Sequence, residues 1–157
     1  MQEALVRALR ARRPHIRAHW EALLRVEPVT SPLAQPETMV HLIDWSIDEV
    51  FALLRNRRGR RPQSPPATLA DARAECHCGR NPLLSHFVAG EQALLEALVL
   101  AQAATPALDP VARDTAVAEL YLAVRTLAQR EVDSFCSLCQ HRAVSKGADT
   151  EAQRAPV

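Results

Sequence analysis

NPLLSHFVAGEQALLEALVLAQAATPALDP, residues 81–110, is the stretch that decides the fold. Asn81 and Pro82 are favoured at the N-cap and at the first position of a helix, respectively. After them, apolar residues recur at helical spacing, at Leu83, Leu84, Phe87, Leu94, Leu95, Leu98 and Val99. Gly90 marks either a weak point of this helix or a place of close packing. We therefore expect a helix over 82–104.

The same stretch contains the turn into the next helix. It ends with Asp109, a suitable N-cap, and Pro110, a suitable first helical residue. We expect a helix over 109–142, and its apolar stripe consists of Val117, Leu120, Tyr121, Val124, Leu127, Val132 and Phe135. With so short a turn between them, the two helices should pack as an antiparallel hairpin.

Two amphipathic segments precede this hairpin. The first, over 2–27, contains Pro14, so its helix either kinks there or begins near Arg13. The second is expected over 36–57, after a turn-rich stretch. The apolar stripe of the first is Leu5, Leu9, Ile16, Trp20, Leu23 and Leu24, and that of the second is Val40, Ile43, Ile47, Val50, Phe51 and Leu54. Four helices are therefore predicted.

The composition agrees with a helical protein of one domain. The chain has 157 residues, of which 48% are hydrophobic and only 4 are glycine. This is enough apolar material for one core and favours helices over strands. The predicted fold class is all-α: a single-domain antiparallel four-helix bundle over 1–143 with a cysteine-rich end, followed by a flexible tail over 144–157.

The charge of the chain is nearly balanced, with 19 basic and 18 acidic residues and a net charge of +1. Such a balance does not favour bulk binding to nucleic acid or to an anionic membrane. The first residues lack the apolar segment of a signal peptide, and no stretch approaches the roughly 18 apolar residues of a membrane span. We expect a cytoplasmic protein whose partner is another protein; the sequence does not indicate a small-molecule ligand.

All four cysteines lie in two short motifs. Cys76 and Cys78 occur in Glu-Cys-His-Cys-Gly, and Cys136 and Cys139 occur in Phe-Cys-Ser-Leu-Cys-Gln-His. In the expected hairpin both helices rise about 1.5 Å per residue, so facing positions have numbers that add up to about 213. The two cysteine pairs should then lie within about one helical turn of each other, which is the scale of a single site.

Four converging thiols in a reducing compartment indicate a tetrahedral metal site. We expect Zn²⁺, which is frequent in closed structural sites, with His77 and His141 as substitute ligands. The same thiolates suit an iron–sulfur cluster. Without a metal, the thiols would form a redox switch or be inert. Covalent haem is rejected because His141 stands one place too late for the motif Cys-x-x-Cys-His.

Other polar residues favour ordinary surface roles. His15 and His19 are four residues apart on one helical face and could bind a metal with His41, but no carboxylate stands at ligand spacing, so we interpret them as surface residues. The basic run Arg55–Arg61 is interpreted as a solvated loop. In an up-down-up-down bundle it would reach the cysteine end, where its charge would offset that of the thiolates.

Enzyme activity has little support in this sequence. It contains no glycine loop that cradles phosphate, no nucleophile elbow, and no serine or cysteine beside a histidine at a recognised catalytic spacing. We expect a protein that is not an enzyme, and keep an enzyme of unknown chemistry as the third interpretation.

One region resembles a known family. From Trp20 through Leu54, Trp-Glu-Ala-Leu-Leu is followed by Ser-Pro-Leu-Ala-Gln-Pro-Glu and then by an amphipathic helix. This pattern resembles the helical N-terminal sensory domains of RsbR-type stress-regulatory co-antagonists and covers about a quarter of the chain. Gln35 stands where the family pattern has asparagine, and the cysteines are not part of the resemblance. The resemblance implies a sensory or regulatory helical module.

The resulting functional hypothesis is a small cytoplasmic metal-binding helical protein, regulatory or interacting with other proteins, with one site of four cysteines. The alternative is a thiol-based redox switch.

Overall fold

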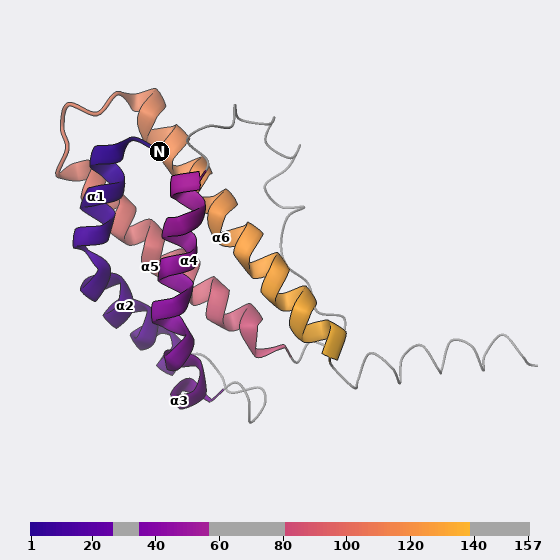
Figure 1. Cartoon of the computed structure of the whole chain (residues 1–157). Helices are drawn as coiled ribbons and strands as arrows, with labels where there is room; N and C mark the ends of the chain where they lie inside the picture. The colour runs from indigo at the N-terminus through magenta and orange to yellow at the C-terminus, as the bar shows by residue number, and fades with distance from the viewer. Residues whose placement is uncertain (27–34, 57–80, 139–157) are drawn as a thin grey trace, which may run out of the picture.

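The computed structural model describes residues 1–26, 35–56 and 81–138, and these residues confirm the all-α class. Within these ranges the secondary structure is helical, joined by short turns, and contains no strand. Figure 1 shows the helices side by side, with the long helix α6 along one flank. The predicted boundary at residue 143 and the predicted tail over 144–157 lie outside the described residues.

The first predicted helix is divided in two. Helix α1 spans Glu3–Ala11 and helix α2 spans Arg13–Val26. They are separated at Arg12, whose backbone leaves the helical conformation (φ −91°, ψ 5°). Pro14 is then the second residue of α2, where its missing N–H disturbs no helical hydrogen bond. Of the two expectations for Pro14, the structure shows a helix that begins at Arg13.

The second predicted segment is helical along its described length, in three parts. Helix α3 spans Pro36–Met39, a 3₁₀ turn η2 spans Val40–Leu42, and helix α4 spans Ile43–Asn56. Pro36 stands at the first position of α3, where a proline is favoured. The buried residues of α4 recur at helical spacing, so this helix presents one apolar face to the core.

Both caps of the predicted hairpin are present. Helix α5 spans Pro82–Ala103 and helix α6 spans Pro110–Leu138. The side chain of Asn81 accepts a hydrogen bond from the backbone N–H of Leu83 at 3.0 Å. Asp109 accepts one from the backbone N–H of Ala112 at 3.1 Å. These carboxyl and amide oxygens satisfy N–H groups that a helix leaves unpaired in its first turn.

Helices α2, α5, α6 and α4 pack in that cyclic order around the core, and α1 packs against α5. The contacts show their directions. Arg12 lies against Leu100 while Trp20 lies against His86, so α2 and α5 are antiparallel. Arg13 pairs with Asp48 while Arg17, one turn later, pairs with Asp44, so α2 and α4 are also antiparallel.

Two helices that are both antiparallel to α2 must run in the same direction, so α4 and α5 are parallel. Figure 1 shows the end of α4 beside the start of α6, far from the start of α5. The expected up-down-up-down order is therefore wrong. The first residue of the basic run, Arg55, belongs to the end of α4 and lies at the end of the molecule opposite Cys136.

Helix α5 contributes more buried residues than any other described helix. Its buried face includes the small residues Ala89, Gly90, Ala93, Ala97 and Ala101, which let neighbouring helices approach closely. One residue of the predicted apolar stripe does not face the core: Val99 is 57% exposed. The period of the apolar residues is ambiguous here because α5 is apolar on more than one side.

Among the described helices, α5 is long and apolar enough to cross a membrane by length and composition, with a mean hydropathy of 1.4 over its best window. The expectation that no segment would reach this threshold is thus not met. The central helix of a bundle passes the same test, and α1, α2 and α6 pack against α5. Length and hydropathy are thus the same for a membrane-spanning helix and for the central helix of a bundle.

Candidate functional site

The described cysteine, Cys136, lies near the end of α6 and is half-buried. The side-chain amide of Asn81 donates to Cys136 Sγ at 3.3 Å and to the backbone carbonyl of Val132, also at 3.3 Å. The N-cap of α5 is therefore held against the last turns of α6. Cys76, Cys78 and Cys139, and the substitute ligands His77 and His141, lie outside the described residues.

The register of α5 against α6 agrees with the arithmetic used for the cysteines. Asn81 contacts Val132, whose number is the one expected opposite it when facing positions add up to about 213. Farther along, Arg125 lies 3.5 Å from Glu91, and Gln102 donates to the carbonyl of Arg113 at 3.1 Å. The hairpin keeps nearly the same register over its length, so the chain enters α5 beside Cys136.

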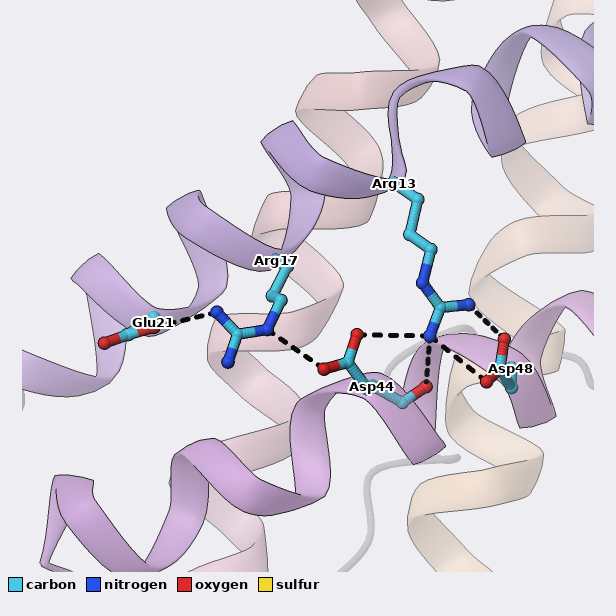
Figure 2. Close-up of polar contacts among 5 residues, drawn as sticks. All are labelled: Arg13, Arg17, Glu21, Asp44 and Asp48. Carbon is cyan, nitrogen blue, oxygen red and sulfur yellow. Dashed lines mark hydrogen bonds and ion pairs between the residues drawn. The ribbon is translucent and has the colours of Figure 1, made fainter.

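Arginines near the start of α2 are paired with acidic residues of α4, as Figure 2 shows. Arg13 forms ion pairs with both Asp44 and Asp48, and Arg17 donates from Nε to Asp44 at 3.0 Å. These contacts hold the pKa of Asp44 below its usual value, the hydrogen bond from Arg17 being the largest cause. The guanidinium charges are thus used in ion pairs between α2 and α4, on an exposed face of the bundle.

The predicted role of the basic run as a partner of the thiolates is not supported. Arg55, Arg10 and Phe51 line a common hollow at the end of α4, and Arg10 stacks over the Phe51 ring at 5.7 Å. This end is opposite Cys136 because α4 is parallel to α5. The rest of the run, residues 57–61, lies outside the described residues.

A cavity of 360 Å³ lies close to Cys136, between α4, the start of α5 and the end of α6. Its walls are mainly apolar, and His86, Ser46, Thr38 and Glu131 add polar groups. The remaining lining residues are Met39, Leu42, Trp45, Pro82, Leu83, Phe87 and Phe135. Phe135 and Pro82 are sequence neighbours of Cys136 and Asn81, so the cavity and the cysteine end are built from the same two helix ends.

His86 is the polar centre of this region. It is fully buried, and its Nε2 atom is 3.0 Å from Ser46 Oγ of α4, while Nδ1 has no hydrogen-bond partner. The Trp20 ring packs on it with centroids 4.8 Å apart, and Trp20 Nε1 donates to its backbone carbonyl at 2.9 Å. Burial lowers the pKa of His86 from 6.5 to about 4, so the imidazole is neutral at physiological pH.

The pairing of His86 with Ser46 is not apparent in the sequence. The helical period could have placed His86 on the buried face, because it is one turn before Gly90 and beside Phe87. Its partner Ser46 comes from a different helix, and no local pattern in α4 indicates it.

A second polar group joins α2 and α5. His19 Nδ1 is 2.8 Å from Glu96 Oε2, and His15 Nε2 is 3.5 Å from Glu96 Oε1. One ligand atom from each of the three residues lies within 4.8 Å of the others. No carboxylate stands at ligand spacing from the two histidines in the sequence, because Glu96 is on another helix. His41, the third residue named with them, is not a member of this group.

Comparison with protein-family models, with curated proteins and with solved structures finds no match to this chain.

Proposed function

We propose that this chain is a small cytoplasmic metal-binding regulatory protein, in which a four-helix bundle carries one site of four cysteines at the end where α5 begins and α6 ends. The contact between Asn81 and Cys136 Sγ carries this proposal. Cys78 precedes Asn81 by three residues and Cys139 follows Cys136 by three. Three residues of chain reach at most about 11 Å, so covalent geometry limits both thiols to the neighbourhood of this contact.

The proposed ligands are Cys76, Cys78, Cys136 and Cys139, with Zn²⁺ as the metal and an iron–sulfur cluster as the alternative. Such a site would clamp one end of the bundle and present a surface to another protein. The absence of catalytic motifs and the resemblance of residues 20–54 to sensory domains support regulation rather than catalysis. The alternative, a thiol redox switch, uses the same cysteines without a metal.

Elemental analysis of protein purified under reducing, oxygen-free conditions tests the proposal. We expect one Zn²⁺ per chain in the thiolate site, and Cys136→Ser should bind it much more weakly, whereas Ser137→Ala, one position along on the exposed side of α6, should not. Iron with sulfide would indicate a cluster. Metal-free protein whose thiols pair reversibly on mild oxidation would overturn the metal proposal in favour of the redox switch.

Hydrogen exchange locates the effect of metal loss. Because helix packing supports the fold apart from any metal, removing the metal should raise amide exchange near Asn81 and Val132 and leave the turn over 105–109 unchanged. Global unfolding of the metal-free protein would contradict this description.

A second candidate function is sensing of a small, mainly apolar molecule in the cavity near Cys136. The observation that favours it is His86: a fully buried, neutral imidazole with an unpaired nitrogen lines an apolar cavity. Buried polar atoms normally have a partner. In the tautomer whose Nε2–H donates to Ser46 Oγ, Nδ1 is an acceptor, and an aromatic ligand with one N–H donor would pair with it.

Indole is a suitable probe for this cavity because it is a flat apolar ring with a single N–H donor. We expect indole to shift the NMR signals of Phe87 and Phe135 and to bind at least tenfold more weakly to Leu42→Trp, which fills the cavity. Val99→Trp on the exposed face of α5 is the control. Equal indole binding by both variants would exclude the cavity as the site.

A further inference from the structure

We infer a second metal site, separate from the cysteines, in which His15 and His19 of α2 and Glu96 of α5 bind a divalent transition-metal ion. The three residues come from two helices that are already packed together. His15 and His19 are one turn apart on the same face of α2, and α2 is antiparallel to α5. Glu96 is placed so that each carboxylate oxygen faces one histidine.

The spacing of the donor atoms fits a metal ion. Metal–nitrogen and metal–oxygen bonds of about 2.0 to 2.2 Å place neighbouring donors about 2.9 Å apart in an octahedron and about 3.4 Å apart in a tetrahedron. The two nitrogen–oxygen distances, 2.8 Å and 3.5 Å, match these separations, and the whole group lies within 4.8 Å. Small rotations of the side chains would therefore complete the site without moving a helix.

The Nδ1 atom of His19 supplies an independent reason. It is buried from solvent and makes no hydrogen bond, although Glu96 Oε2 is only 2.8 Å away. The contact therefore lacks the geometry of an N–H···O hydrogen bond, and the nitrogen has no hydrogen-bond partner. A cation between the nitrogen and the carboxylate would satisfy both, because a metal accepts the lone pair of each.

The donors define the class of ion. Two imidazole nitrogens and one carboxylate suit Zn²⁺, Co²⁺ or Ni²⁺, whereas Mg²⁺ and Ca²⁺ prefer all-oxygen sites. Three protein ligands leave at least one position for water, and His15 and Glu96 are exposed. The site is thus accessible from solvent and suited to an exchangeable ion, unlike a closed site of four thiolates.

The experiment is titration of metal-stripped, reduced protein with Co²⁺, observed by absorption and by histidine ring NMR. Cobalt bound to thiolates shows a sulfur-to-metal charge-transfer band, which nitrogen and oxygen ligands lack, so the two sites can be followed separately. We expect Co²⁺ to perturb the ring signals of His15 and His19 far more strongly than those of His41, because its paramagnetic effect falls steeply with distance. Co²⁺ that perturbs only the cysteine band would overturn the inference and leave the proposed function intact.

Two variants test the ligands. Glu96→Gln keeps the size of the side chain and His19→Ala removes one ligand, and each should weaken binding at the histidine site by at least about tenfold. His41→Ala is the matched control, and melting curves are recorded to check that all three variants are folded. Replacing all four cysteines by serine should abolish the charge-transfer band while the histidine signals still respond. Unchanged affinity in Glu96→Gln and His19→Ala would exclude the site.

Discussion

The two sides of α2 are joined to their neighbours by different interactions. Toward α5, Trp20 is completely buried, packs on His86 and fits against Gly90. Toward α4, Arg13 and Arg17 form ion pairs with aspartates that are at least half exposed. Burial of an aromatic ring contributes far more to stability than exposed ion pairs, which are worth about 0 to 1 kcal/mol each. The comparison teaches that the α2–α5 contact stabilises the fold, while the α2–α4 network mainly orients the helices.

The largest effect is expected from Gly90→Ala. A Cβ atom at this position would lie 2.5 Å from Trp20 Cε2 and closer still to Cζ2 and Cη2. The indole is enclosed and cannot move aside, so we expect a loss of about 3 kcal/mol in the free energy of unfolding, measured with urea. At a helix position with free space around it, the same substitution would stabilise the protein by about 1 kcal/mol. The sign of the change in the free energy of unfolding therefore shows whether Trp20 packs closely against Gly90.

Gln92→Ala, on the exposed side of α5, is the control for this substitution and should change stability little. A Gly90→Ala protein as stable as the parent would show that the contact between Trp20 and α5 is loose.

The second effect depends on pH. The pKa of His86 falls from 6.5 to about 4 in the folded state because the imidazole is buried. The folded state thus binds fewer protons than the unfolded chain between these values, and stability is complete above pH 6.5 and falls as the pH is lowered to 4. The total loss is about 3 kcal/mol, with no further loss from this group below that pH.

Urea unfolding at a series of pH values measures this dependence. His86→Gln, which cannot titrate, should be less stable at neutral pH but lose this slope between pH 6.5 and 4, whereas His41→Gln should keep it. A slope that persists in His86→Gln would assign the pH dependence to another group.

The smallest effect is expected in the network of Figure 2. Asp44→Asn removes the charge that Arg13 and Arg17 share, and because this side chain is 51% exposed we expect a loss below about 1 kcal/mol. The loss should shrink further at high salt, since screening weakens exposed ion pairs. Asp114→Asn, on the exposed side of α6, controls for the change of charge. A loss comparable to that of Gly90→Ala would reverse the comparison between the two sides of α2.

Local patterns predicted the parts of this fold that depend on neighbouring residues. The caps at Asn81 and Asp109 follow from side chains and prolines that act within one turn. Pro14 likewise predicted an interruption of the first segment, but left open whether the helix kinks there or begins near Arg13, where α2 starts. The register of α5 against α6 was also predictable, because the turn between them is too short to allow another arrangement. The four-cysteine site remains a prediction, of which Cys136 is the described member.

The direction of α4 could not be predicted in this way. A helix of 14 residues is about 21 Å long, and the 25 residues between α4 and α5 can span that length easily. The connection therefore permits both the parallel and the antiparallel arrangement, and the packing of the apolar faces selects the parallel one. The same reason explains why Arg55, at the end of α4, lies at the other end of the bundle from Cys136.

The sequence by itself determined the helical class, both ends of α5, the start of α6 and the register of their hairpin, because propensity, capping and a short turn act locally. Only the tertiary structure decided which residues from different helices meet: Ser46 with His86, Glu96 with His15 and His19, and Trp20 with Gly90. These meetings depend on the rotation and direction of each helix, which are determined by packing of the whole core. What a buried histidine or an exposed carboxylate can bind therefore depends on the partner residue that this packing places beside it.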